Sequence, residues 1–467
     1  MFVLFSAALA LAAPSADTHP FSVHDMLAMD RIADARVSPD GKRVSFTVST
    51  TDLEGNRRRS DVWIADVDGG NARALTTHPS SDFNARWMSD GKSIVFLSTR
   101  GGSSQVWQLA LDGGEAQQLT KFPLDVENLD VFPGGESLLL SFDVWPAAQT
   151  LAESAEKDAA AAKKKGSGKL YDALPIRHWD TWADAKRSHV FTWRIGSDAP
   201  VDLMKGLDCD APTKPFGGFE ETSISPDGAS VALVFKNVGR EFAWSTNSDV
   251  YLAPADGSTP PRNVSSDGPG YDTHPVFSPS GRTLAYLSMP RAGYEADRQQ
   301  IVLMDVASGA KRLLAQGWDR SASDLVWSAD EKTLFTSAAN LGNTSIFAID
   351  VASGDVRTLI ERGSNSAPLL AGARLVFSRN HLKSPAELYS MNLDGSDLRA
   401  VTSLNAAKVA AARMGDYEQF HFAGAKGEKV HGYVMKPADF EPGKRYPVAF
   451  LIHGGPQGSF GDSFHYR

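Results

Sequence analysis

The chain has 467 residues, more than one ordinary domain needs, so two or three folding units are expected. Its 42% hydrophobic and 22% charged residues are typical of globular proteins and exclude wholesale disorder. The formal net charge of −9 argues against nucleic-acid binding, because such proteins gather lysine and arginine on one face. The single cysteine, Cys209, excludes stabilisation by an internal disulfide.

An apolar run opens the chain, "MFVLFSAALALAAPSADTHPF", and it ends in small residues with Ala-x-Ala spacing at Ala10 to Ala12. This pattern predicts a secretory signal peptide over residues 1–16 and therefore a periplasmic or secreted protein. A membrane anchor is the alternative, but the run is shorter than the roughly 20 residues that a span needs. Residues 17–35 are predicted to form an N-terminal helical segment.

A recurring phrase dominates the next part of the chain. It reads "ARVSPDGKRVSF" from Ala35, "ARWMSDGKSIVF" from Ala85 and "TSISPDGASVALVF" from Thr222, and further copies bring the number to seven. Each copy predicts a β-hairpin, because an apolar strand, a Ser-Pro-Asp-Gly turn and an alternating strand follow one another. A further strand pair lies between copies, and four strands per repeat are typical of a propeller blade. We predict a seven-bladed β-propeller over residues 36–405; a β-sandwich array is the alternative, but it lacks such self-similarity.

One long gap between copies holds a low-complexity insertion at about residues 147–172, which is predicted to be flexible. Its lysine run, 163–165, is interpreted as a solvated loop. Directly after it, "RHWDTW" brings two aromatic residues, an arginine, a histidine and an aspartate within six positions.

The character of the sequence changes after residue 405. Two alternating strands and a proline-bounded loop lead into an apolar strand, "VAFLI" from Val448, which ends in His-Gly-Gly-Pro. The absence of polar alternation in this strand suits coverage by helices on both faces. Residues 406–467 are therefore predicted to begin a second, α/β domain, so that the fold class is mainly β: a seven-bladed propeller followed by the first strands of an incomplete α/β-hydrolase domain.

The combination of these features resembles the prolyl oligopeptidase family of serine peptidases. "FGGFEETSISPDG", "RHWDTW" and "AWSTNSDVYLA" are most similar to its dipeptidyl-peptidase five type, with acylaminoacyl-peptidases as further relatives, and the resemblance begins at about Pro20. It implies a secreted exopeptidase that removes dipeptides from free N-termini, with the propeller as a filter over the active site. It implies peptide substrates and no cofactor, no nucleic acid, and no membrane contact after signal cleavage.

The sequence departs from this family in one large respect. Members carry a Gly-x-Ser-x-Gly elbow, an Asp and a His after His-Gly-Gly-Pro, and the present chain contains no Gly-x-Ser-x-Gly. The nucleophile, acid and base are thus expected to be absent, and the chain alone is predicted to be inactive. The resemblance assigns the oxyanion-binding N–H to Gly455 and the freedom of the turn to Gly454. His453 is interpreted as structural.

The resemblance to a dipeptidyl-peptidase also requires a group that recognises the free amine. Carboxylates form strong charge-assisted hydrogen bonds to ammonium groups, and Glu220 and Glu221 are our candidates. Solvated loop carboxylates are the alternative reading, and Glu241 and Glu295 are weaker rivals.

Two further candidates lie in "RHWDTW". Arg177 is predicted to hold a substrate carbonyl or carboxylate, and Trp179 to line an apolar subsite, unless Arg177 and Asp180 simply pair within a strand. The histidines lack metal-ligand spacing, so no metal site is predicted. The competing function is a non-catalytic periplasmic propeller that binds peptide or protein, like that of the TolB translocation protein.

Overall fold

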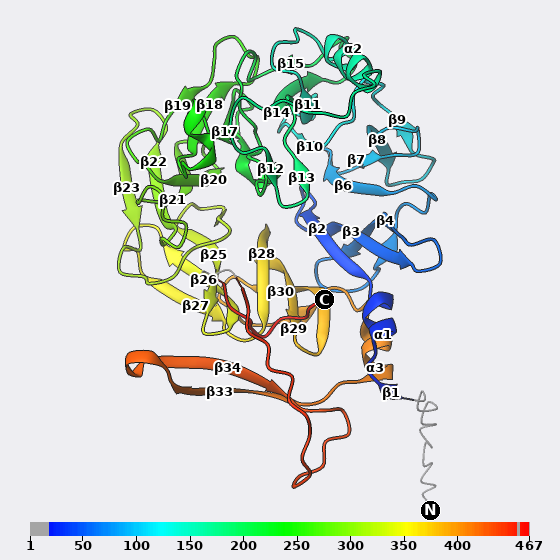
Figure 1. Cartoon of the computed structure of the whole chain (residues 1–467), viewed down its shortest axis with the longest axis vertical. Helices are drawn as coiled ribbons and strands as arrows, with labels where there is room; N and C mark the ends of the chain where they lie inside the picture. The colour runs from blue at the N-terminus through cyan, green and yellow to red at the C-terminus, as the bar shows by residue number, and fades with distance from the viewer. Residues whose placement is uncertain (1–17, 455–457, 467) are drawn as a thin grey trace, which may run out of the picture.

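The computed structural model describes residues 18–454 and 458–466, so the predicted signal peptide and Gly455 lie outside the described residues. Seven antiparallel blades of four strands each stand around a common axis and form a ring (Figure 1). One parallel pair, Thr344 with Ser364, joins the last two blades into a single eight-stranded sheet. This arrangement confirms the predicted seven-bladed propeller. None of the helices in the described ranges is both long and apolar enough to cross a bilayer.

The first three blades use strands from the N-terminal half of the ring. Blade 1 contains β2 (Arg31–Val37), β3 (Arg43–Asp52), β4 (Arg57–Asp66) and β5 (Arg73–Ala74). Blade 2 contains β6 (Asp82–Trp87), β7 (Ser93–Ser98), β8 (Gln105–Ala110) and β9 (Gln117–Gln118). Blade 3 contains β10 (Asn128–Val131), β11 (Ser137–Val144), β14 (Arg187–Arg194) and β15 (Val201–Asp202).

The other four blades complete the ring. Blade 4 contains β16 (Thr222–Ile224), β17 (Ser230–Phe235), β18 (Asp249–Pro254) and β19 (Arg262–Asn263). Blade 5 contains β20 (Tyr271–Phe277), β21 (Thr283–Met289), β22 (Gln300–Asp305) and β23 (Lys311–Leu314). Blade 6 contains β24 (Val326–Trp327), β25 (Thr333–Asn340), β26 (Asn343–Asp350) and β27 (Val356–Ile360). Blade 7 contains β28 (Ser364–Ala371), β29 (Arg374–His381), β30 (Ser384–Asn392) and β31 (Arg399–Ala400).

The Ser-Pro-Asp-Gly phrase makes the turn between the first and second strands of a blade. In blade 1, the Ser38 hydroxyl donates to Asp40 at 2.6 Å and accepts from the Arg43 amide at 2.9 Å. Gly41 then takes a φ of 72°, a left-handed conformation that glycine adopts without strain. The recurrence of the phrase along the chain therefore reflects the geometry of one turn.

A second recurring device joins the third and fourth strands. In blade 2, the Thr120 hydroxyl donates to Gln105 at 2.8 Å and accepts from the Val106 amide at 2.9 Å. Thr76 in blade 1 and Thr402 in blade 7 repeat these contacts with the third strands of their own blades. These buried hydroxyls fix the short outer strands, which have few ladder hydrogen bonds of their own.

The ring closes between blades 7 and 1, each of which is built from consecutive strands. The N-terminal segment bridges the seam: β1 (His19–Pro20) pairs in parallel with β32 (Ala412–Arg413), and α1 (Val23–Ala28) leads into blade 1. α3 (Ala406–Ala411) follows blade 7. Asn405 accepts from the Asp30 amide at 2.8 Å and donates to the Asp30 carbonyl at 3.1 Å, so one buried side chain joins the two ends of the propeller.

Replacing Asn405 with alanine is expected to lower the free energy of unfolding by about 2 kcal/mol, because two backbone groups of Asp30 lose their partner. Chemical denaturation measures the loss. Asn237→Ala is the matched control, since Asn237 is exposed and makes no side-chain hydrogen bond within the described ranges. Equal stability of the two variants would contradict this role of Asn405.

The insertion in blade 3 is more ordered than its sequence suggests. α2 (Leu151–Ala162) occupies its first half and buries Leu151 against blade 3. The Ser154 hydroxyl of this helix accepts a hydrogen bond from the Trp145 amide at 2.8 Å. The predicted flexible segment therefore contains a helix, begun by the Thr150 cap. After the helix, β12 (Arg177–His178) and β13 (Thr181–Trp182) form a small hairpin, which Figure 1 shows near the middle of the ring.

Beyond the propeller, β33 (Tyr417–Ala423) and β34 (Lys429–Met435) form an exposed hairpin. The predicted buried strand at Val448–Ile452 is wrong for this structure: the segment pairs with no described strand, and the side chain of Phe450 is 80% exposed. A strand of this kind takes its hydrogen bonds from parallel neighbours and its cover from helices, and the described residues supply neither.

Candidate functional site

The predicted amine-binding pair lies on the connection from β15 to β16, in a short 3₁₀ turn, η1 (Phe219–Glu221). The structure separates the two carboxylates. Glu221 is 1% exposed and accepts hydrogen bonds from the amide and hydroxyl of Thr213 and from the hydroxyls of Tyr271 and Thr273. Glu220 is exposed, so it alone of the pair is accessible to a ligand.

The two glycines before η1 explain how both carboxylates fold back onto the backbone. A side chain at position 217 would collide with the carboxylate of Glu221 and with Thr213. A side chain at position 218 would collide with the carboxylate of Glu220, which accepts from the Gly218 amide at 3.0 Å. The sequence "FGGFEE" thus encodes a loop that is wrapped around its own two glutamates.

The charge of Glu220 reaches residues on two well-separated blades. Burial lowers the pKa of Arg36 on β2, with Glu220 among the acidic groups that oppose the change. Burial also lowers the pKa of His274 on β20, and there Glu220 is the charge that opposes the change most. Because Arg36 and His274 project from the innermost strands of blades 1 and 5, we place Glu220 over the axis of the ring.

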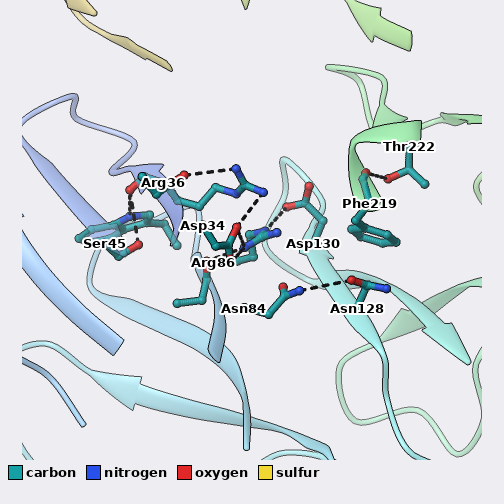
Figure 2. Close-up of polar contacts among 12 residues, drawn as sticks. Asp34, Arg36, Ser45, Asn84, Arg86, Asn128, Asp130, Phe219 and Thr222 are labelled. Atoms are coloured by element: carbon teal, nitrogen blue, oxygen red, sulfur yellow. Dashed lines mark hydrogen bonds and ion pairs between the residues drawn. The ribbon is translucent and has the colours of Figure 1, made fainter. Parts of the chain in front are cut away.

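An ion-pair cluster, here called the axial cluster, lies on the innermost strands of blades 1 to 3. Asp34 contacts Arg36 at 3.0 Å and Arg86 at 2.9 Å, and Arg86 lies 3.7 Å from Asp130 (Figure 2). The side chain of Arg36 is 40% exposed, and burial lowers its pKa.

The axial cluster was not predicted from the sequence. Asp34 and Asn84 both adopt positive φ at β-bulges, which re-aim the side chains of the innermost strands. A signal was nevertheless present, since "DAR" and "NAR" precede the turn phrase in copies one and two. A comparison of these positions between copies would have identified the polar side chains that the innermost strands place at the axis of the ring.

The hairpin of "RHWDTW" presents an aromatic group beside the same loop. Trp179, at the hairpin turn, is 74% exposed and packs on His178 and on Phe216, with ring centroids 4.7 and 5.5 Å apart. Arg177 donates to the Trp179 carbonyl at 2.7 Å, and its guanidinium lies 5.9 Å from the centre of the Trp182 ring. The described residues contain no Arg177–Asp180 ion pair, so the simple pairing considered for this stretch is absent there.

The remaining predicted residues lie elsewhere. Glu241 and Glu295 are exposed on the β17–β18 and β21–β22 connections, and the charge of Glu295 acts on Lys236. Gly454 is exposed, with open space around its Cα, and His453 packs on Phe460 at 5.7 Å. Gly455, the predicted oxyanion donor, lies outside the described residues, and Gly454 faces no assembled site in them.

The arrangement combines one accessible carboxylate with exposed aromatic surface at the axis of the ring. A carboxylate favours an ammonium group, and aromatic faces favour apolar side chains and cations. Among the described residues, no group of three potential metal ligands converges. An accessible carboxylate beside aromatic faces is chemically suited to a cationic organic ligand.

Comparisons with known proteins agree with this architecture. The model of the TolB β-propeller domain matches residues 30–143. Dipeptidyl-peptidase 5 of Porphyromonas gingivalis is 31% identical over 94% of this chain and 64% of its own length. Probable dipeptidyl-peptidase 5 of Arthroderma benhamiae is 30% identical over 96% of this chain and 65% of its own length. The chain thus spans just under two thirds of these curated relatives.

A solved structure shows the same fold. The acylaminoacyl peptidase of Pyrococcus horikoshii superposes with a TM-score of 0.71 over 96% of this chain and 64% of that chain, at 16% identity. The match extends past the propeller, which supports the predicted architecture of a propeller followed by part of a hydrolase domain.

Proposed function

Because this chain is a homologue of dipeptidyl-peptidase 5 along nearly its whole length, we propose that it is the propeller-bearing part of a serine exopeptidase of the prolyl oligopeptidase family. The enzyme releases dipeptides from the free N-termini of peptides through an acyl-enzyme. The observation that carries the proposal is the exposed Glu220 on a fixed loop at the axis of the ring.

Glu220 binds the substrate ammonium in this proposal. The group is accessible, and its carboxylate is already oriented by the Gly218 amide. A charge-assisted hydrogen bond to a carboxylate is stronger than a neutral one and distinguishes a free amine from an acylated one. Trp179 and Phe216 supply an apolar wall beside it, and Arg177 orients the Trp179 carbonyl rather than the substrate.

The catalytic step lies outside what the described residues contain. We assign the Gly455 N–H to the oxyanion, as in other α/β-hydrolases, where it would stabilise the charge that develops on the scissile carbonyl. The chain contains no Gly-x-Ser-x-Gly elbow, so binding rather than hydrolysis is the activity to measure on these 467 residues. We also propose export, on the basis of the N-terminal apolar run.

Replacing Glu220 with glutamine is expected to weaken binding of a free-amine tripeptide about tenfold or more, the loss of one hydrogen bond to a charged group. Isothermal titration calorimetry on the purified chain measures the affinity, and the N-acetylated tripeptide should bind both proteins equally weakly. Glu241→Gln, on another exposed loop, is the control and should leave both affinities unchanged. Unchanged free-amine affinity in Glu220→Gln would overturn the assignment.

A non-catalytic propeller is the second candidate, favoured by the match of residues 30–143 to the TolB propeller domain. Such a protein binds a folded partner or an internal peptide segment and has no requirement for a free amine. Equal affinity for the free and the N-acetylated tripeptide would therefore favour this alternative.

A further inference from the structure

The loop from Thr213 to Glu221 is closed by the second glutamate of the pair. The carboxylate of Glu221 accepts from the Thr213 amide at 2.6 Å with one oxygen and from the Thr213 hydroxyl at 2.8 Å with the other. Two backbone hydrogen bonds, Gly217 to Thr213 and Glu221 to Gly218, tighten the same segment. One buried side chain thus joins the two ends of the loop.

The same carboxylate ties the loop to the neighbouring blade. Tyr271 and Thr273, both on β20 of blade 5, donate hydroxyls to Glu221 at 3.2 and 3.4 Å. On the other side, Lys214 reaches Asp143 of blade 3 at 2.7 Å. The loop is therefore held between the blades on either side of its own.

The loop packs closely around the carboxylate of Glu221. Position 217 accommodates only glycine, because a Cβ there would collide with the Glu221 carboxylate. The exposed residues of the loop are Lys214, Pro215, Phe216 and Glu220, and of these Phe216 and Glu220 lie on either side of the two glycines. Their relative placement depends on the closed form of the loop.

We propose that Glu221 is a positioning residue, which does not touch the substrate but holds residues 213–220 closed so that Glu220 and Phe216 meet the N-terminal residue together. This inference rests on the proposed function, because it concerns the loop that carries the amine-binding carboxylate. The two glutamates then have different roles: the exposed Glu220 binds the substrate ammonium, and the buried Glu221 fixes the position of Glu220. Preorganisation of this kind raises affinity by lowering the ordering cost of binding.

The protonation state of Glu221 affects how firmly its hydrogen bonds hold the loop of residues 213–221 closed. Burial, aided by the charge of Glu220, raises the pKa of Glu221 to about 7, while its hydrogen bonds from Thr213 and Tyr271 oppose the rise. The pKa of Tyr271 is itself raised to about 12, so its hydroxyl stays a donor, and His274 on the same strand has a pKa lowered by burial. Because the buried carboxylate is disfavoured when charged, the closed loop should weaken as the pH rises through about 7.

The test compares two variants at position 221 with the wild type. Glu221→Ala leaves the donors of Thr213 without an acceptor, whereas Glu221→Gln keeps an amide oxygen there and cannot ionise. We expect Glu221→Ala to lower free-amine affinity at least fivefold and to speed amide hydrogen exchange in residues 213–220, and Glu221→Gln to restore both. In the wild type, exchange corrected for its intrinsic pH dependence should be faster at pH 8 than at pH 6, and in Glu221→Gln it should not.

Thr213→Val provides an independent arm, because it removes one donor and leaves both glutamates in place. It should loosen the loop in the same direction as Glu221→Ala, though less. Reduced affinity with unchanged loop exchange in Glu221→Ala would overturn the inference, since Glu221 would then contact the ligand, and unchanged values of both would overturn it as well. Faster amide exchange in Glu221→Ala together with unaltered free-amine affinity in Glu220→Gln would instead contradict the proposed function. It would still support the role of Glu221 in holding the loop closed.

Discussion

Arg100→Met is expected to lower the free energy of unfolding by about 3–5 kcal/mol, because it leaves a buried carboxylate without its counter-charge. Asp82, on β6, is fully buried, and its ion-pair partner among the described residues is Arg100, which is 14% exposed. The second oxygen of Asp82 has no hydrogen-bond partner within the described ranges, so nothing else there offsets the loss. Methionine keeps the aliphatic part of the side chain but removes the guanidinium, which lies 5.0 Å from the centre of the Trp107 ring and donates to the Ser98 hydroxyl at 2.9 Å.

Denaturant unfolding at neutral pH measures this effect, and two further variants define its origin. Arg58→Met removes an exposed arginine and should change the stability by less than about 0.5 kcal/mol. The double variant Asp82→Asn with Arg100→Met removes both charges and should recover much of the loss. A double variant as unstable as the single one would show that packing, rather than the unpaired charge, is responsible.

The propeller could be predicted from the sequence because its signals are local. Each Ser-Pro-Asp-Gly turn satisfies its own hydrogen bonds within six residues, as Ser38 and Asp40 do with the Arg43 amide, so the phrase recurs with the blade. Even the copy that lacks the glycine keeps the geometry: Glu331 takes a φ of 60° at that position. The seven-blade count followed from this repetition alone.

The candidate site was predicted only in part. The sequence identified Glu220 and Glu221 as a pair, but it could not distinguish them, because their burial depends on Tyr271, fifty positions away, and on the close approach of Gly217. The axial cluster depends on bulges that shift the register of the innermost strands, which alternation does not reveal. These contacts are non-local, and patterns of neighbouring residues do not encode them.

The apolar segment at Val448–Ile452 shows the opposite failure. Its composition is that of a buried strand. Composition shows only that such a segment favours burial, and it does not supply the helices or neighbouring strands that would bury it. In the described structure its side chains face solvent and its backbone joins no sheet.

A second buried carboxylate should make the stability of the propeller depend on pH. Asp272, on β20, is 3% exposed, and burial raises its pKa to about 6, while hydrogen bonds from Ser288 and Ser265 oppose the rise. The unfolded chain releases this proton near pH 4 and the folded chain only near pH 6. Between these values the unfolded state binds fewer protons, so this group lowers the stability as the pH rises.

Asp272→Asn is therefore expected to stabilise the protein at pH 8, by up to about 3 kcal/mol, and to have little effect at pH 4. The amide keeps the shape of the carboxyl, and the serine hydroxyls can rotate to accept hydrogen bonds from it. Because asparagine does not ionise, position 272 is neutral at every pH in the variant. Thermal or denaturant unfolding of both proteins from pH 4 to pH 8 gives the difference directly. Asp350→Asn, at an exposed turn whose hydrogen bonds lower the pKa of its carboxyl, should show no stabilisation at pH 8. A constant difference between Asp272→Asn and the wild type across this range would mean that folding does not raise the pKa of this carboxyl. Only a difference in proton binding between the folded and unfolded states makes the stability difference vary with pH.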